Sequence, residues 1–160
     1  MPEYPPWNAD RAASIIEQYR HHEGAALPIL HALMEAFGHV PEPAIPLIAE
    51  ALNLTRAEVH GVASFYHDFR RDPPGRHVLR LCRAEACQAM GADCLHDAAR
   101  DRLGIGWHET TADGAVTLEP VFCLGLCAVA PSGMLDGAPL GRLDPAALNA
   151  TLDTALEGAR

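Results

Sequence analysis

Two pairs of cysteines constrain this chain more than any other feature. Cys82 and Cys87 are spaced C-x4-C, and Cys123 and Cys127 are spaced C-x3-C. Each pair lies in a turn-like segment that follows an apolar strand pattern. Four thiolates brought together suit a tetrahedral zinc ion or an iron-sulfur cluster. One isolated cysteine is often only a small buried hydrophobe, but packing alone gives no reason for thiols at both ends of both loops.

The composition is that of a globular protein and limits the classes of partner. The 160 residues are 49% apolar, and the formal net charge is -9. Because nucleic-acid affinity rests largely on Lys and Arg neutralising phosphates, we expect no nucleic-acid partner. The first residues lack the pattern of a signal peptide, and no segment reaches about 18 uninterrupted apolar residues. We therefore expect a cytoplasmic protein without direct membrane insertion, where paired cysteines bind metal or act catalytically rather than form disulfides.

The first half of the chain contains four short helical patterns. We expect four helices: one over residues 11–20, a second with Pro28 in its first turn and its end before Gly38, a third over 42–53 and a fourth over 56–64. In the second, four apolar residues follow the i, i+3, i+4, i+7 spacing of one buried stripe: Leu30, Leu33, Met34 and Phe37. Gly38 suits a left-handed C-cap of that helix, and Thr55 with Glu58 has the spacing of a capping box for the fourth. The sequence of these helices shows no recognisable set of catalytic or metal-binding residues. We therefore interpret them as a four-helix bundle for packing or partner docking.

The spacing of apolar residues changes from a period of 3.6 to a period of 2 around residues 70–75. Pro73 and Pro74 in this segment forbid a continuous helix. We place a boundary here, with a helical, partner-docking domain over 1–74 and an α/β domain over 75–160. The fold class predicted for the whole chain is therefore α+β.

In the second half we expect alternating strands and helices. The expected elements are a strand over 77–82, a helix over 86–103, a hairpin of 107–111 with 115–121, a hairpin from 133–135 to a strand near Leu140, and a helix over 145–157. Asp113-Gly114 is typical of a type I′ turn, and Asp136-Gly137 supplies the second turn. Cys94 lies within the expected helix over 86–103, and we expect it to be buried and inert.

The connectivity predicts where the cysteine pairs meet. If 77–82, 86–103 and 115–121 form a right-handed β-α-β unit, the two strands are parallel and their carboxyl ends emerge at one edge. Cys82 and Cys87 follow one end, and Cys123 and Cys127 follow the other. We therefore expect the fold to assemble a four-thiolate site at that edge.

The spacing favours a cluster over zinc at this site. Structural zinc usually lies on two C-x2-C knuckles, and neither pair has that spacing. Longer loops suit a 2Fe-2S cluster, in which each iron takes two cysteines. Two other classes stay open: a zinc-stabilised interaction module, and a thiol enzyme. A thiol enzyme would need a reactive cysteine of low pKa with a base beside it. The Ala-Glu-Ala segment between Cys82 and Cys87 does not supply that base.

Several motifs together resemble one known family. They are the C-x4-C pair, Cys123-Leu-Gly-Leu-Cys127 followed by Ala130-Pro131, and Gly61-Val-Ala-Ser-Phe-Tyr-His-Asp-Phe69. They are similar to the thioredoxin-like 2Fe-2S subunits of respiratory complex I, NAD-reducing hydrogenases and NAD-dependent formate dehydrogenases. The resemblance covers about residues 14–158 and implies a thioredoxin-like α/β ferredoxin domain after the helical bundle.

The resemblance also implies a site, a cofactor and partners. In that family the four matching cysteines, Cys82, Cys87, Cys123 and Cys127, bind one 2Fe-2S cluster. The run from Ser64 to Arg70 looks most like the gamma subunit of a formate dehydrogenase. The implied partners are a flavin- and NAD-binding subunit and a molybdenum-containing formate dehydrogenase subunit. The chain alone has no G-x-G-x-x-G after a strand and no Walker loop, so we expect it to be non-catalytic by itself.

Overall fold

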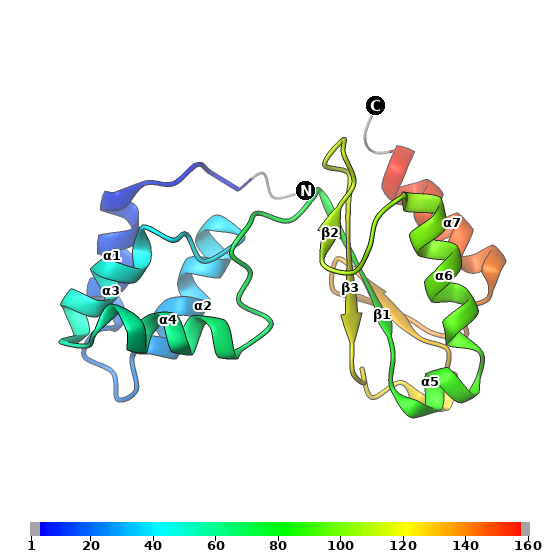
Figure 1. Cartoon of the computed structure of the whole chain (residues 1–160), viewed down its shortest axis with the longest axis horizontal. Coiled ribbons are helices and arrows are strands. Elements are labelled where there is room, and N and C mark those ends of the chain that lie inside the picture. The colour runs from blue at the N-terminus through cyan, green and yellow to red at the C-terminus, as the bar shows by residue number, and fades with distance from the viewer. Residues whose placement is uncertain (1–3, 158–160) are drawn as a thin grey trace. The chain divides into compact units, whose positions relative to one another are not determined.

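The computed structural model describes residues 4–157, which divide into two compact units at Pro73 and Pro74 (Figure 1). Each unit has its own hydrophobic core. Residues 1–3 and 158–160, which the sequence-based domain ranges include, lie outside the described residues. No helix within residues 4–157 is long and apolar enough to cross a membrane.

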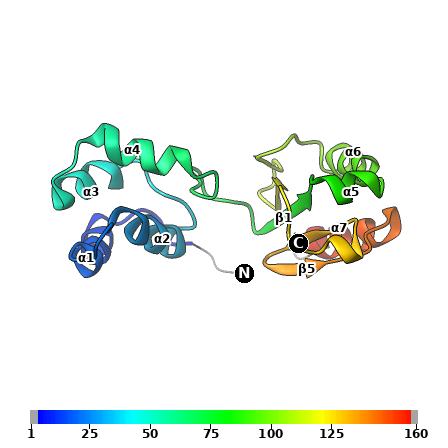
Figure 2. The same cartoon turned by 90° about the horizontal axis from the view of Figure 1, so that it is seen from below.

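The first unit is entirely helical. Its elements are α1 (Ala9–Tyr19), α2 (Ala26–Phe37), α3 (Ala44–Leu52) and α4 (Arg56–Phe65). The Asn8 side chain accepts a hydrogen bond from the Arg11 amide and caps α1. Gly38 ends α2 with a φ of 75°, which confirms the left-handed cap predicted there. In Figure 2 the four helices lie in two pairs, with α3 beside α4 and α1 beside α2, and α1 also contacts α3.

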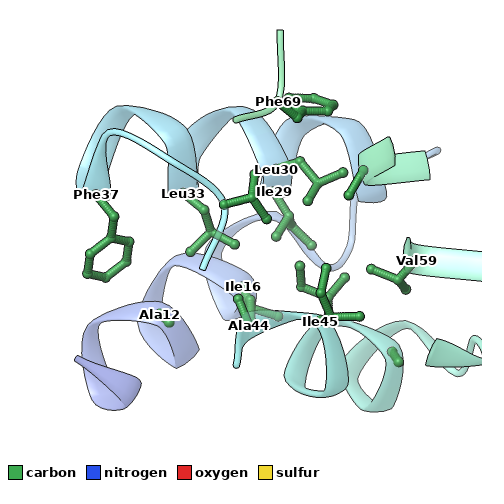
Figure 3. Close-up of a cluster of buried hydrophobic side chains, with 14 of the residues drawn as sticks. Ala12, Ile16, Ile29, Leu30, Leu33, Phe37, Ala44, Ile45, Val59 and Phe69 are labelled. Carbon is green, nitrogen blue, oxygen red and sulfur yellow. The ribbon is translucent and has the colours of Figure 1, made fainter. Parts of the chain in front are cut away.

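The apolar stripe of α2 forms the centre of this unit's core. Leu30, Leu33 and Phe37 are fully buried, as the spacing predicts, whereas Met34 is only partly buried. Figure 3 shows these side chains converging with Ile16 of α1 and Val59 of α4. Complete burial of a Leu or Phe contributes roughly 1.5–3 kcal/mol, so the core rather than helix propensity holds these short helices together.

The second unit is a five-stranded mixed sheet with helices. Its strands are β1 (His77–Cys82), β2 (Glu109–Thr110), β3 (Val116–Val121), β4 (Gly133–Leu135) and β5 (Ala138–Leu140), in the order β2-β3-β1-β4-β5. Its helices are α5 (Glu85–Ala89), α6 (Ala92–Leu103), the 3-10 turn η1 (Cys127–Val129) and α7 (Pro145–Glu157). Only β1 with β3 is parallel. Alternate residues of β1 and β3, including Leu79 and Leu118, pack with Leu95 of α6 and Leu148 of α7.

Two local predictions in this unit are wrong. The helix expected over 86–103 is divided into α5 and α6 at Met90 and Gly91. Gly91 has a φ of 83°, a left-handed conformation that an α-helix cannot contain and that glycine adopts without steric cost. The break separates α5 from α6, and Leu95 and Ala99 of α6 pack into the core formed with the sheet.

The two Asp-Gly turns differ from each other. The turn at Asp113-Gly114 is not type I′, because only the glycine has a positive φ. The Asp113 carboxylate instead accepts hydrogen bonds from the Ala115 amide and the Thr111 hydroxyl. At Asp136-Gly137 both residues have positive φ, and the turn joins β4 to β5 as predicted.

Candidate metal centre

The parallel pairing of β1 with β3 brings the two cysteine-bearing loops together. Cys82 is the last residue of β1 and pairs with Val121, the last residue of β3. Both strands therefore end in register at one edge of the sheet. Figure 1 shows α5 and the chain following β3 at that same end. The β-α-β prediction that placed the two pairs at one edge is confirmed.

The first pair, Cys82 and Cys87, is buried. Their exposed fractions are 2% and 1%, and they pack with Ala92 in a small cluster of their own. Cys87 lies within α5, whose first turn follows directly from β1. The Cys87 sulfur is 3.4 Å from the Ser132 hydroxyl oxygen. This pair is therefore shielded from water, with apolar packing around both cysteines and the Ser132 hydroxyl beside the Cys87 sulfur.

Hydrogen-bond donors converge on the Cys82 sulfur. Burial is the largest single influence and raises the pKa of Cys82, but several hydrogen bonds together outweigh it. They come from the backbone of Ala84, the Cys87 thiol, and the backbones of Cys123 and Leu124. The pKa of Cys82 is consequently held below its ordinary value. These hydrogen bonds stabilise the thiolate form of Cys82, which is the form that binds metal.

The second pair, Cys123 and Cys127, is exposed. The two sulfurs are 3.9 Å apart, and two thiolates bound at about 2.3 Å to one tetrahedral metal lie about 3.8 Å apart. The Gly125 amide donates to the Cys123 sulfur at 3.3 Å, and a φ of 76° at this glycine turns the loop back on itself. Cys123 itself has a φ of 96°, a conformation that costs about 1–3 kcal/mol and clusters at functional sites.

The two pairs also influence each other electrostatically. A hydrogen bond with the Cys123 thiol and the charge of Cys123 raise the pKa of Cys127 most strongly. Burial and the charges of Cys87 and Cys82 add to this effect. The charges of all three other cysteines therefore act on Cys127, although the loops that carry the two pairs are far apart in sequence. A bound cation would relieve the repulsion between the sulfurs.

The geometry agrees with a comparison to known families. Residues 12–156 match the model of the thioredoxin-like [2Fe-2S] ferredoxins. The chain belongs to that family. As a ferredoxin it is an electron-transfer protein, and its cofactor is a 2Fe-2S cluster. The resemblance noted from the cysteine motifs is confirmed.

Relatives of this ferredoxin chain include components of larger enzymes. It is 40% identical over 136 residues to a subunit of the NADH-quinone oxidoreductase of Pseudomonas aeruginosa, covering 82% of each chain. It is 36% identical over 149 residues to the corresponding subunit from Escherichia coli, covering 91% of this chain and 89% of the relative. A crystal structure of an NAD+-reducing [NiFe]-hydrogenase matches with a TM-score of 0.68 and 27% identity, over 80% of this chain and 22% of the hydrogenase chain.

The residues of the site fit a 2Fe-2S cluster. Within residues 4–157 no group of three or more His, Cys, Asp or Glu side chains is gathered to hold a single metal ion. The thiols are arranged as two pairs, and a cluster with two irons takes its four cysteines in this way. Backbone amides already directed at Cys82 and Cys123 are the donors that such sulfurs need.

Three other residues near the site differ from expectation or were missed. Cys94 is exposed on α6, so the expectation that it is buried is wrong. One buried imidazole, His96, lies with Nε2 3.1 Å from the Cys82 carbonyl oxygen, although no histidine was assigned a role. Ser132 is also buried beside Cys87. Neither signal is visible in the sequence, since both contacts span many residues.

Proposed function

We propose that Cys82, Cys87, Cys123 and Cys127 are the ligands of the cluster, and that the chain works as one subunit of an NAD-linked oxidoreductase complex. The observation that carries the ligand set is the parallel pairing of β1 with β3, which delivers both pairs to one end of the sheet. When bound, the cluster accepts and returns a single electron. The chain's own part is to hold the sulfurs and adjust how readily that electron is accepted.

The unequal exposure of the two pairs gives the site a direction. Cys82 and Cys87 are buried, whereas Cys123 and Cys127 are exposed. The exposed phenyl ring of Phe122 adjoins the second pair in sequence. Electrons therefore exchange with a partner on the side of Cys123 and Cys127, while the buried pair anchors the site to the sheet. We expect a low potential for this centre, with plant-type ferredoxins at roughly -400 mV as the scale.

The partner proposed for this side is a flavin- and NAD-binding subunit. The relatives from Pseudomonas aeruginosa and Escherichia coli are subunits of NADH-quinone oxidoreductases, and the hydrogenase is NAD+-reducing. An electron acceptor of this kind works next to a flavin because flavin hydroquinone can release electrons one at a time. The isolated chain is then an electron carrier and not an enzyme by itself.

The helical unit, residues 1–74 in the proposed domain division, serves as the docking domain, and we assign it as a four-helix bundle. It contains a groove of about 940 Å³ between the α1–α2 connection, α3 and α4. Phe65, Tyr66 and Leu54 line the groove and are exposed, with 73% of Phe65 accessible. An exposed apolar patch of this kind marks an interaction surface. Phe65 and Tyr66 lie within the segment Gly61–Phe69, which we place at the junction with the flavoprotein.

Among possible complexes we favour an NAD-dependent formate dehydrogenase, with this chain as its gamma subunit. The support is the run Ser64-Phe-Tyr-His-Asp-Phe-Arg70, which looks most like that subunit. A molybdenum-containing formate dehydrogenase subunit is then part of the same complex, in the cytoplasm. The second candidate is the equivalent subunit of an NADH-quinone oxidoreductase, because the relatives from Pseudomonas aeruginosa and Escherichia coli carry that name.

Anaerobic affinity purification of the tagged chain from its native host tests both the proposed cluster and the proposed complex. We expect two irons and two acid-labile sulfides per chain, together with a copurifying flavoprotein and a molybdenum-containing subunit. Iron and sulfide are quantified chemically, and the partners are identified by mass spectrometry. A matched preparation of a variant with Cys82 and Cys87 both changed to Ser controls for adventitious iron.

Two outcomes would contradict different parts of the proposal. One tightly bound zinc, with no iron and no visible absorption, would replace the electron carrier by a zinc-stabilised interaction module. A quinone-reducing membrane complex in place of the molybdenum subunit would keep the cluster but assign the chain to an NADH-quinone oxidoreductase.

A further inference from the structure

Apart from the cysteine thiols, the Ser132 hydroxyl is the one side-chain group within residues 4–157 that lies at hydrogen-bonding distance from a proposed ligand sulfur. Its hydroxyl oxygen is 3.4 Å from the Cys87 sulfur, and both residues are buried, with 3% and 1% exposed. No other hydrogen-bond partner of this hydroxyl occurs in the described part of the chain. A buried hydroxyl is expected to make a hydrogen bond, so the sulfur is its natural partner.

The backbone holds this serine in place. Its carbonyl oxygen accepts the Cys82 amide hydrogen bond at 3.0 Å. The next residue, Gly133, begins β4 and pairs with Leu81 in β1. Backbone pairing in the sheet therefore fixes the position of residue 132. Because this pairing does not involve the side chain, a substitution of Ser132 should keep it. Ser132 contacts both cysteines of the buried pair, one through its backbone and one through its side chain.

We propose that Ser132 is a positioning residue that donates a hydrogen bond to the Cys87 sulfur and raises the reduction potential of the centre. This inference rests on the ligand set proposed above. As a ligand, the Cys87 sulfur is a thiolate without a proton, so the hydroxyl must be the donor. Reduction adds negative charge to the centre, and a donor stabilises the more negative state more strongly.

The effect of the Ser132 hydroxyl can be measured separately from that of the other hydrogen bonds to the sulfurs. The hydrogen bonds from protein groups to Cys82 and Cys123 include those from the amides of Ala84, Leu124 and Gly125, which substitution of a side chain does not remove. The Ser132 hydroxyl can be removed without touching them. Its loss should change the potential and the spectrum of the centre while leaving the four thiols in place.

The test compares substitutions at position 132 in the full-length, cluster-loaded protein. Ser132→Ala should shift the one-electron equilibrium about tenfold toward the oxidised form, which corresponds to about 59 mV more negative. Ser132→Thr keeps a hydroxyl and should restore the potential. The readouts are EPR-monitored redox titration and the resonance Raman bands of the iron–thiolate bonds. Thr117→Val is the matched control, because it removes another buried hydroxyl of the same unit, bonded to the Gly75 amide and Thr110.

Threonine and valine have nearly the same shape, so Ser132→Thr and Ser132→Val isolate the hydroxyl even if the alanine variant does not fold. A lower potential for valine than for threonine supports the inference. Equal potentials and unchanged Raman bands within this pair overturn it, as does an equal shift in Thr117→Val. Failure of the ligand set is distinguished by Cys87→Ser, because an unchanged EPR spectrum in that variant would show that Cys87 is not a ligand.

Discussion

Cys94 and the four paired cysteines carry the same side chain in different surroundings. Cys82 receives several hydrogen bonds that lower its pKa, and Cys127 has its pKa raised by neighbouring sulfurs. Cys94 is exposed on α6. Burial therefore does not separate Cys94 from the proposed ligands, since Cys123 and Cys127 are exposed as well.

Serine substitutions should separate the two kinds of cysteine. Replacing any one of Cys82, Cys87, Cys123 or Cys127 by Ser should lose or distort the cluster, because a hydroxyl is a poor substitute for a soft thiolate. Cys94→Ser should keep it and change the free energy of unfolding by no more than about 0.5 kcal/mol, as for other surface substitutions. EPR of the reduced protein checks all five variants. Loss of the signal in a folded Cys94→Ser protein would show that the ligand set is wrong.

At the scale of the element, α4 shows how a short helix is begun. The Thr55 hydroxyl accepts a hydrogen bond from the Glu58 amide, and the Glu58 carboxylate accepts one from the Thr55 amide at 2.7 Å. The capping box predicted from the sequence is thus confirmed. The hydrogen bonds from the Thr55 backbone and then from its side chain lower the pKa of Glu58. A cap of this kind typically contributes about 1 kcal/mol.

The capping box makes the stability of the helical unit depend on pH. Because the pKa of Glu58 is lower in the folded state, its contribution is present above the ordinary value of 4.5 and is lost as pH falls through the folded value. Glu58→Gln should remove this part of the pH dependence. Urea unfolding followed by circular dichroism between about pH 3 and 7 measures it. Glu35→Gln on α2 is the control, and identical pH profiles for the two variants would contradict the prediction.

At the scale of the whole molecule, the chain combines the proposed cluster site with the proposed docking surface. The sheet unit holds the four cysteines, and the helical unit has the exposed groove lined by Phe65 and Tyr66. Neither unit contains a nucleotide-binding fingerprint, since no G-x-G-x-x-G follows a strand and no Walker loop occurs. Under the proposed function, the chain carries an electron and receives it through a flavin- and NAD-binding partner.

Reduction by NADH should therefore require the flavoprotein. The isolated, cluster-loaded chain should show no NADH or formate oxidation, and NADH should reduce its centre only after the flavoprotein is added. Stopped-flow absorbance measures the reduction, and dithionite serves as the control because it should reduce the isolated chain directly. Rapid reduction of the isolated chain by NADH would contradict the proposed division of roles.

The sequence by itself determined most of the elements and the candidate ligands. Caps such as Thr55 and Gly38 and the period-2 pattern of 77–82 depend on residues within a few positions of each other, where local geometry decides. The parallel pairing was predicted from connectivity, because a helical crossover between two neighbouring strands returns the chain to the end at which the first strand began. The tertiary structure decided what depends on distant residues. It divided the helix at Gly91, exposed Cys94, buried one cysteine pair while exposing the other, and placed Ser132 against Cys87, 45 residues away.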